Sequence, residues 1–284
     1  MKIKLSLVLV LLGVFLLVVS CAPQAPGSSA TTSAKEQYKT LPSGESTANQ
    51  GRVVFTIADA AADMNSVSRV VVTIDSISVH SDTEGWVTVS SIPQTTDLLL
   101  LKAEGAQRLL ADVKLKEGSY QQLRLDISKV VVTDNTGEHQ AKLPSGELKI
   151  IGGFNVSANS TSTAKFDFIA DESLHRTGNG EYILAPVVQL ETREDADVDV
   201  KADNKVEVKN GHVKTNIKVG MDVDGNVGVG LHIPKEAKVS LSNGKVKLET
   251  TLSVGLGSGS GKEESAQENT NASANAAVKV KVGY

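Results

Sequence analysis

The chain has 284 residues, of which 40% are hydrophobic and only 4% aromatic, and its formal net charge is −4. This hydrophobic fraction is ordinary for a globular protein of one or two domains, and the small negative charge argues against a nucleic-acid partner or a polybasic lipid-binding surface. Valine and threonine are abundant, so the composition favours β-structure without the aromatic surfaces that many ligand platforms use.

The N-terminus has the layout of an export signal. Two lysines precede the apolar run Leu5–Val19, which is shorter than the roughly 20 residues that a stable membrane span requires. Cys21, the only cysteine, follows directly, and Ser20 supplies the small residue that lipoprotein processing needs. We therefore expect residues 1–20 to be a cleaved lipoprotein signal peptide and Cys21 to be the lipid attachment site.

This anchor predicts a localisation at the cell membrane, facing the periplasm or the cell exterior. Two alternatives remain open, namely a short uncleaved anchor and ordinary cleavage that leaves Cys21 as a free thiol. Lipidation consumes the single thiol, so we expect no disulfide within the chain. Stability outside the cytoplasm would then depend on hydrophobic burial.

Composition divides the rest of the chain into five regions. They are a flexible Ser/Thr/Ala/Pro-rich tether (21–50), a β-sandwich domain (51–192), a β-hairpin repeat segment (193–256), a polar linker (257–277) and a C-terminal strand (278–284).

Short alternating segments dominate the sandwich domain. Strands are predicted over 52–59, 67–80, 86–89, 121–127, 130–133, 148–151, 165–170 and 182–190. In the second strand the apolar positions change phase at Asp75-Ser76, which predicts a β-bulge. Residues 97–101 are apolar on both faces and are expected to be buried, and Ala103–Val113 is expected to form a short helix. The predicted fold class is all-β, an antiparallel β-sandwich of the prealbumin-like or immunoglobulin-like kind, followed by a smaller antiparallel β-meander.

The order of these segments resembles a known family. The run VVFTIADA, VSRVVVTIDSISVH, GWVTV, DLLLL, LKEGSYQQLRLDI, FDFIADESL and EYILAPVVQL is similar to the domain of unknown function 4382, found mostly in prokaryotic lipoproteins. The resemblance covers about residues 51–190 and departs from the family after the first strand, where Asp59 is followed by Ala60-Ala61. The family has no established activity, so the resemblance implies the fold and no catalytic residue.

The segment after residue 193 contains an internal repeat. Lys205–Lys214 matches Lys238–Lys247, and each copy holds an Asn-Gly pair, Asn210-Gly211 and Asn243-Gly244, that predicts a β-hairpin turn. Asp224-Gly225 predicts a third turn. One apolar face is expected to pack on the main domain or on the C-terminal strand. The residues of that face are Val213, Ile217, Val219, Met221, Val223, Val227, Val229, Leu231, Ile233, Val246, Leu248, Leu252, Val254 and Leu256.

No catalytic, cofactor-binding or metal-binding motif is recognised, so we expect no catalytic residue, cofactor or metal ligand. The histidines are scattered without metal-ligand spacing, and Trp86 is interpreted as a core or strand-edge residue. Two acidic groups leave calcium binding open. Asp222 and Asp224 resemble the start of a calcium loop, although a hairpin turn explains them better because Ile233 stands where a glutamate is expected. Asp195, Asp197 and Asp199 share one side of a predicted strand, where a solvated face is favoured.

The favoured function is a non-catalytic, membrane-anchored lipoprotein that binds a protein, an envelope polymer or a small ligand, with no nucleic-acid partner. One alternative is an envelope hydrolase or divalent-cation-binding protein whose site gathers Asp59, Asp63, Asp167 and Asp171; the other is a purely structural spacer. Sequons at Asn155, Asn159 and Asn271 leave glycosylation open.

Overall fold

The structure is a computed structural model that describes residues 39–40, 49–59, 64 and 66–249. Several predictions concern residues outside these ranges. They are the signal peptide, Cys21, most of the tether, Asp63, Asn271, the linker 257–277, the strand 278–284, and Leu252, Val254 and Leu256 of the expected apolar face. Neither of the two helices within the described ranges has the length and hydropathy needed to cross a membrane.

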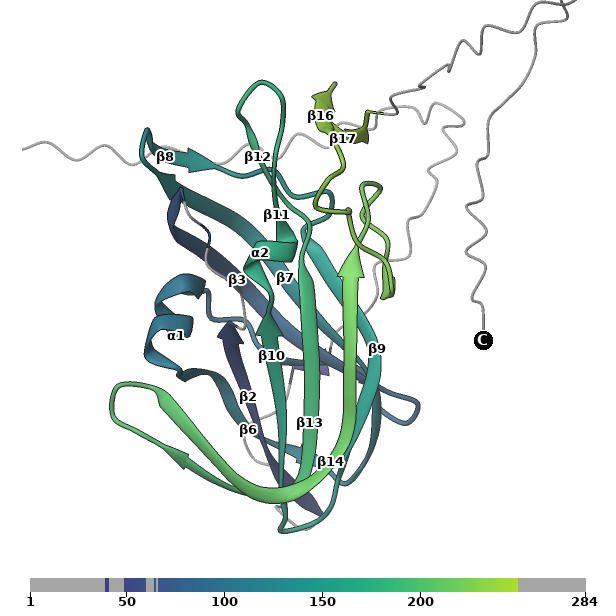
Figure 1. The fold of residues 1–284 in the computed structure, drawn as a ribbon. Coiled ribbons are helices and arrows are strands. Elements are labelled where there is room, and N and C mark those ends of the chain that lie inside the picture. The colour runs from purple at the N-terminus through teal and green to yellow at the C-terminus, as the bar shows by residue number, and fades with distance from the viewer. Residues whose placement is uncertain (1–38, 41–48, 60–63, 65, 250–284) are drawn as a thin grey trace, which may run out of the picture.

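Two facing β-sheets form most of the described chain, so the predicted all-β, sandwich-like class is confirmed. Sheet A contains β1 (Lys39–Thr40), β3 (Val67–Ser81), β4 (Gly85–Ser90), β5 (Gln94–Asp97), β7 (Gly118–Asp134), β8 (Gly137–Gln140) and β9 (Glu147–Val156). Sheet B contains β2 (Gln50–Asp59), β6 (Gln107–Lys116), β10 (Thr161–Phe168), β13 (Val187–Val200), β14 (Lys205–Met221) and β15 (Val227–Val229). The strands of sheet A run diagonally across those of sheet B (Figure 1).

Smaller elements cover the ends of the sandwich. Two hairpins pair β11 (Leu174–Arg176) with β12 (Tyr182–Leu184) and β16 (Val239–Ser242) with β17 (Lys245–Leu248). The helices are α1 (Leu98–Glu104) and α2 (Ala170–Ser173). In Figure 1 both hairpins lie at the end of the sandwich where β8 also lies.

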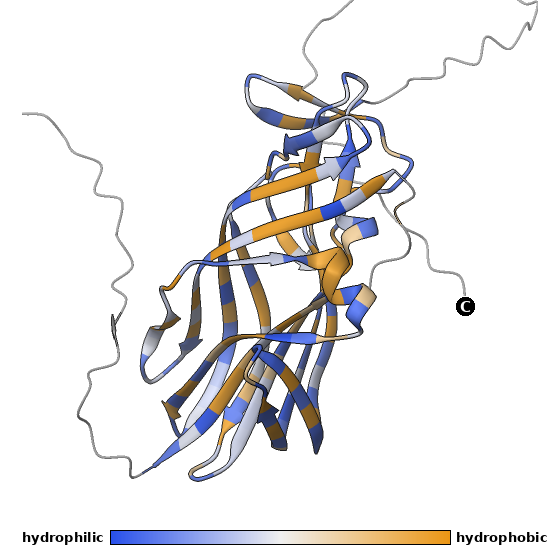
Figure 2. Cartoon of the chain, turned by 90° about the vertical axis from the view of Figure 1, so that its left-hand side faces the viewer, coloured by the Kyte–Doolittle hydropathy of each residue, from blue (hydrophilic) through white to orange (hydrophobic). Residues whose placement is uncertain are grey.

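The core lies between the two sheets and follows the alternation of each strand. Hydrophobic and hydrophilic residues form alternating bands along the strands (Figure 2), as expected when one face of each sheet is buried. The largest fully buried rings are Phe55, Phe154, Phe166 and Phe168. Three of these four come from sheet B and Phe154 comes from β9 of sheet A, so the two sheets share one core.

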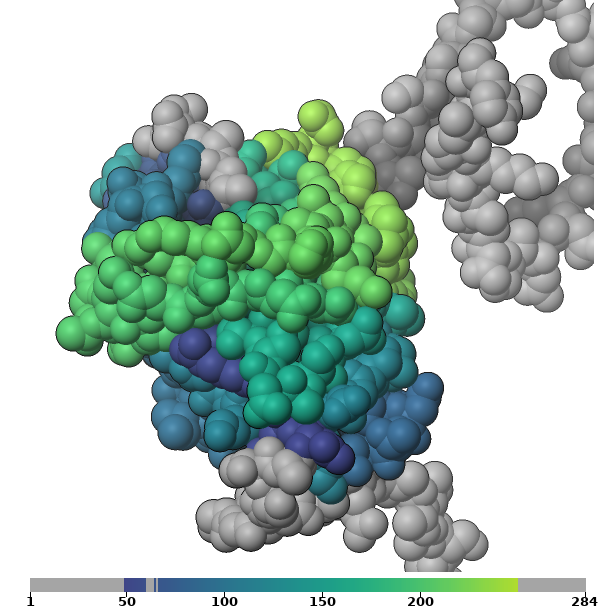
Figure 3. All heavy atoms as spheres, turned by 90° about the horizontal axis from the view of Figure 1, so that it is seen from below, coloured from purple at the N-terminus to yellow at the C-terminus, as the bar shows by residue number. Residues whose placement is uncertain are grey.

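Sheet B departs from a purely antiparallel arrangement. β10 pairs with β2 in parallel, from Thr161 opposite Arg52 to Phe168 opposite Asp59, while its other pairings are antiparallel. The β13–β14 hairpin bends across the lower end of the molecule (Figure 3), and β14 reaches β6 through Lys205 opposite Arg108. Since β13 also pairs with β14, the sheet curls until its two ends meet.

The predicted bulge in β3 is confirmed. The register of β3 against β7 shifts at Thr73–Ile74 and again between Ile74 and Ser76. The Asp75 carboxylate accepts a hydrogen bond from the hydroxyl of Ser128 at 2.7 Å. The extra residue lets both halves of the strand bury their apolar side chains.

The predicted helix over Ala103–Val113 is wrong. The helix is α1, Leu98–Glu104, and residues 107–116 form β6. The leucine run favours a helix, Gly105 ends it with a φ of 58°, and β6 is held as a strand by its long pairing with β2. Leu98 and Leu101 are buried, whereas Leu100 is 46% exposed, so the expected burial on both faces holds for only part of the run.

Only one of the two Asn-Gly pairs forms a hairpin turn. Asn243-Gly244 joins β16 to β17 as predicted, and Asp222–Asn226 joins β14 to β15. Asn210-Gly211 lies inside β14, opposite β13, so the predicted turn there is wrong. Both residues keep positive φ values, 56° and 75°, and they kink the strand without reversing it.

The segment after residue 193 packs on the main domain, as expected. The predicted boundary at residue 192 lies within β13, and Val219, Met221, Ile233 and Val246 are buried in the shared core. The expected apolar face is incomplete, however. Val213, Val229 and Leu248 are 50%, 73% and 47% exposed, because these residues belong to the kinked region, a short edge strand and the end of an outer hairpin.

Candidate functional site

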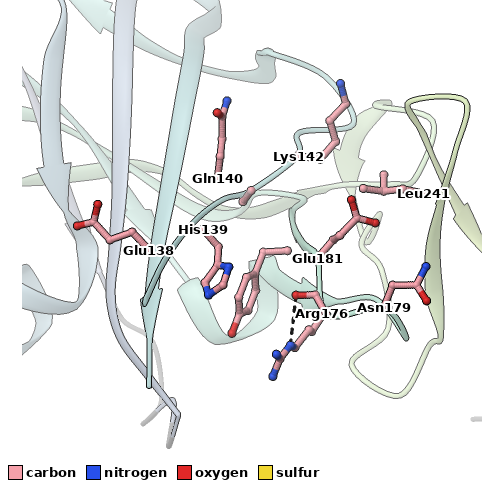
Figure 4. A pocket seen from close by; sticks show the side chains of 11 residues that line it. Glu138, His139, Gln140, Lys142, Arg176, Asn179, Glu181 and Leu241 are labelled. Atoms are coloured by element: carbon pink, nitrogen blue, oxygen red, sulfur yellow. Dashed lines mark hydrogen bonds between the residues drawn. The ribbon is translucent and has the colours of Figure 1, made fainter. Parts of the chain in front are cut away.

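A pocket of about 770 Å³ lies at the end of the sandwich that carries both small hairpins (Figure 4). Its walls are β8 with the following residues Ala141 and Lys142, the β11–β12 hairpin, and Leu241 of β16. These segments are distant in sequence and meet because β8 pairs with β7 while Lys142 forms a parallel bridge with Ile183. A pocket of this volume is large enough for a small molecule or a short peptide.

Behind the pocket wall, the carboxylate of Asp134 at the end of β7 joins two of the lining residues, His139 and Tyr182. Its Oδ1 accepts hydrogen bonds from the Thr136 main-chain N–H at 2.7 Å, the Thr136 hydroxyl at 2.6 Å and His139 Nε2 at 3.1 Å. Its Oδ2 accepts one from the Tyr182 hydroxyl at 2.8 Å. An aspartate that binds main chain two residues later is typical of tight turns, and here it also ties the β7–β8 turn to β12.

This network also fixes the charge of Asp134 behind the pocket wall. Its donors, above all the Thr136 hydroxyl and then Tyr182, hold the pKa of Asp134 well below its usual range. Burial raises the pKa of Tyr182, and its bond to Asp134 raises that pKa further. At neutral pH this network therefore contains an ionised carboxylate and a neutral phenol, and its hydrogen bonds hold the β7–β8 turn and β12 together.

The position of His139 does not match that of the histidine in a nucleophilic relay. In such a relay the histidine uses one ring nitrogen for the hydroxyl and the other for the carboxylate. Here Nε2 is the atom that contacts both the Thr136 hydroxyl, at 2.8 Å, and Asp134. Because the Thr136 hydroxyl donates to Asp134, it accepts from His139, so we assign the proton to Nε2.

Four exposed charged side chains surround the opening, namely Glu138, Lys142, Arg176 and Glu181. Within the described residues none of the four forms an ion pair. The Arg176 guanidinium lies 5.5 Å from the centre of the Tyr182 ring, and its Nε donates to the Gly180 carbonyl at 3.4 Å. These charges are available to a bound molecule.

Of the four aspartates proposed for a hydrolase, the three within the described ranges each have a local partner. Asp59 accepts from the Ala170 main-chain N–H at 3.2 Å, Asp171 pairs with Lys235 at 2.5 Å, and Asp167 lies 3.5 Å from Lys165. Burial raises the pKa of Asp167. Within the described ranges, no group of three or more His, Cys, Asp or Glu side chains is placed to hold a metal ion.

The two candidate calcium segments are occupied by hydrogen bonds of their own. Asp222 accepts from the main-chain N–H of Asp224 at 3.0 Å and of Asn226 at 2.9 Å, which is a turn, the interpretation favoured from sequence. Ser160 donates to Asp195, Asn210 donates to Asp197, and Lys201 pairs with Asp199. The last three carboxylates lie on one side of β13, each with a separate neighbour.

Other residues singled out in the sequence lie apart from the pocket. Trp86 is 8% exposed, with the Arg124 guanidinium 4.1 Å from its ring centre, consistent with a structural role. His175 is buried, and burial lowers its pKa to about 4. Asn155 is partly buried in β9, whereas Asn159 is exposed at a turn with a φ of 60°.

Sequence reasoning missed the pocket entirely. Asp134, His139 and Tyr182 come from segments interpreted only as strands or turns. The sequence Asp134-Asn-Thr-Gly137 is a recognisable turn signal, but nothing local indicates that Tyr182 reaches the same carboxylate.

Comparison with known proteins identifies one family. The family model for Domain of unknown function (DUF4382) matches residues 50–186. No curated protein and no solved structure matches the chain. The match runs from β2 to the residue before β13 and agrees with the resemblance seen in the sequence over about residues 51–190. Residues 50–186 of this chain are therefore a domain of the DUF4382 family.

Proposed function

We propose that the protein is a lipid-anchored, extracytoplasmic binding module without catalytic activity, and that the pocket beside β8 is its ligand site. The anchor is supported by the sequence, where Cys21 directly follows the apolar run Leu5–Val19. A tether from Cys21 would leave the sandwich free to meet a partner near the membrane surface.

The observation that carries the binding proposal is the contrast between the support behind the pocket wall and the rim of the pocket. Behind the wall, Asp134 accepts hydrogen bonds from the lining residues His139 and Tyr182, so their positions are set before any ligand binds. At the rim, the charged side chains of Glu138, Lys142, Arg176 and Glu181 have no ion-pair partner among the described residues. A preformed pocket with available charges suits selective binding.

Site-specific photo-crosslinking in intact cells tests the binding proposal. A photoreactive residue at Glu181, on the pocket wall, should give a discrete adduct with an envelope component. The same residue at the exposed Asp82, outside the pocket, should not. Equal labelling at both positions, or no adduct at either, would favour the structural spacer.

The anchor is tested separately. A Cys21→Ser change should abolish incorporation of a labelled fatty acid and release the protein from the membrane fraction, whereas Ser28→Ala in the tether should change neither. If Cys21→Ser leaves the protein in the membrane fraction, the lipid anchor is wrong.

A further inference from the structure

Among the described residues, no strand covers the outer edge of β8, and this edge lies along the pocket. In an antiparallel pair, successive residues alternate between bonding the partner strand and pointing their main-chain groups away from it. Ala141 donates its N–H to the Val130 carbonyl of β7 at 3.0 Å. In the same register, His139 opposite Val132 bonds β7, while Glu138 and Gln140 direct their N–H and C=O groups outward.

The hydrogen bonds of Lys142 confirm this alternation. Lys142 is the next outward-facing residue, and its N–H donates to the Tyr182 carbonyl while its C=O accepts from the Leu184 N–H, both at 2.8 Å. β12 thus covers the edge at Lys142. In Figure 4 the side chains of Gln140 and Lys142 point to the same side of the chain, as two residues apart in a strand should.

The segment that precedes Tyr182 does not continue along β8 to reach Gln140 and Glu138. On the N-terminal side of Tyr182, Gly180 donates to the Thr177 carbonyl at 2.9 Å and Thr177 donates to the Glu181 carbonyl at 2.9 Å. This tight turn directs the hairpin away from β8 and leaves the pocket between them. Among the described strands, none other than β7 pairs with β8.

We infer that the pocket binds an extended peptide segment of a partner protein, which adds to β8 as a further strand. This inference rests on the proposed function and names its ligand class. Alternating N–H and C=O groups at Glu138 and Gln140 match the main chain of an extended peptide. The acidic and basic side chains of the rim would then select peptides that carry complementary charges.

The site is less suited to a sugar. Binding of a sugar ring usually needs an open aromatic face, and the aromatic ring in this pocket is that of Tyr182, which is 3% exposed. Arg176 lies over that ring, and the His139 ring centre is 5.6 Å from it. The exposed groups that remain are main-chain edge and charged side chains, which favour a peptide.

The test begins with a library of random linear heptapeptides displayed on phage and selected on the full chain. Enriched peptides are then synthesised and titrated against three proteins: wild type, Gln140→Pro and Gln140→Ala. Proline removes the outward N–H without removing a β7 bond, so binding should weaken at least about tenfold. Gln140→Ala keeps that N–H and should bind within about threefold of wild type.

A second measurement does not depend on any variant folding. With an enriched peptide bound to wild type, amide exchange should slow at Glu138 and Gln140 and stay unchanged at His139 and Ala141, whose N–H groups face β7. N-methylation at alternate positions of the peptide should abolish binding, while methylation at the intervening positions should not.

The outcomes separate this inference from the proposed function. Strand addition would be overturned by peptides or envelope ligands whose binding requires Arg176 but is not weakened by Gln140→Pro or by N-methylation. Such a result would leave the pocket as the binding site. Pairing of β8 with β8 of a second copy, seen as a dimer that Gln140→Pro dissolves, would also overturn it. If nothing is enriched and crosslinking at Glu181 is also negative, both proposals fail.

Discussion

Two edge strands lie along the same side of β7, and their outer main-chain groups have different environments. β9 pairs with the first half of β7, and β8 pairs with the second half. At Gly153 and Asn155 the outer groups of β9 bond side chains from sheet B, whereas the outer groups of β8 line a pocket.

The covering of β9 is specific. The hydroxyls of Thr192 and Thr215 donate to the Gly153 carbonyl at 3.0 and 2.7 Å. The Asn155 N–H donates to Glu194 at 3.2 Å, and Ser162 donates to the Asn155 carbonyl at 2.8 Å. Proteins normally protect sheet edges because open ones invite pairing with other chains. Since this sheet protects one edge in such detail, the open edge beside it is a candidate for function.

The largest loss of stability is expected when the buried ring that anchors β9 is removed. The Phe154 ring is stacked 5.4 Å from Tyr120 and lies edge-on 6.0 Å from Phe55. Phe154→Ala should therefore lower the free energy of unfolding by roughly 3–5 kcal/mol, measured by urea titration. Ile151→Ala, in the same strand but 74% exposed, should change it by less than about 0.5 kcal/mol. Equal losses would show that β9 is not anchored through Phe154.

The Asp134–Tyr182 hydrogen bond beside the β8 pocket should be the next most sensitive feature. Tyr182→Phe removes a donor to the ionised Asp134 and should lower stability by roughly 1–3 kcal/mol. Tyr120→Phe, beside β9, removes a hydrogen bond at 3.0 Å to an uncharged acceptor, the main-chain carbonyl of Lys116. This change should lower the free energy of unfolding by about 1 kcal/mol or less. A larger loss for Tyr120→Phe would contradict the assignment of an ionised Asp134.

The same network predicts a dependence on pH. Because the pKa of Asp134 is lower in the folded protein than its ordinary value of 3.8, its contribution is complete above that value and is lost as the pH falls below it. The free energy of unfolding of wild type should therefore fall more steeply between about pH 5 and about pH 3 than that of Asp134→Asn, in which residue 134 does not titrate. Urea titration at several pH values measures both slopes, and equal slopes would contradict the lowered pKa of Asp134.

Removing the two hydroxyl groups that cover the outer edge of β9 should have a smaller effect on stability. Thr192→Val and Thr215→Val each leave one hydroxyl on the Gly153 carbonyl, so each single change should cost less than about 1 kcal/mol and the double change about 1–2 kcal/mol. The double variant should also aggregate faster than wild type, as measured by light scattering. A double variant as soluble as wild type would mean that these hydroxyls do not protect the edge.

The smallest effect on stability is expected at the open edge. Gln140→Pro removes no bond to β7 and should change the free energy of unfolding by less than about 0.5 kcal/mol. Ala141→Pro removes the bond to Val130 and should be clearly more destabilising. Thermal unfolding of both variants measures the difference. If Gln140→Pro were the more destabilising of the two, Gln140 and not Ala141 would be the residue that bonds β7.

Local patterns predicted the strands of the sandwich well and its irregular parts poorly. The alternation that predicts β2, β3 and β10 records burial on one face, which is a property of each strand itself. The pairings of these strands are not local, which is why the parallel alignment of β10 with β2 was not foreseen.

The repeated Asn-Gly pair shows how pairing overrides a turn signal. Asn243-Gly244 forms its turn between two short strands, while Asn210-Gly211 is held within β14 by the long ladder with β13. A Cβ on Gly211 would lie 2.7 Å from the Glu194 carbonyl oxygen, so glycine there permits a close approach across the ladder. The pocket was unpredictable for a similar reason, because Asp134 and Tyr182 meet only in the folded chain.

Residue-resolved amide hydrogen exchange of the free protein shows directly whether the outer edge of β8 is open beside the pocket. The amides of Glu138 and Gln140 should exchange rapidly, while those of His139, Ala141 and Lys142, which have main-chain acceptors, should be protected. Protection of Glu138 and Gln140 equal to that of Lys142 would show that the edge is already covered and would contradict the account.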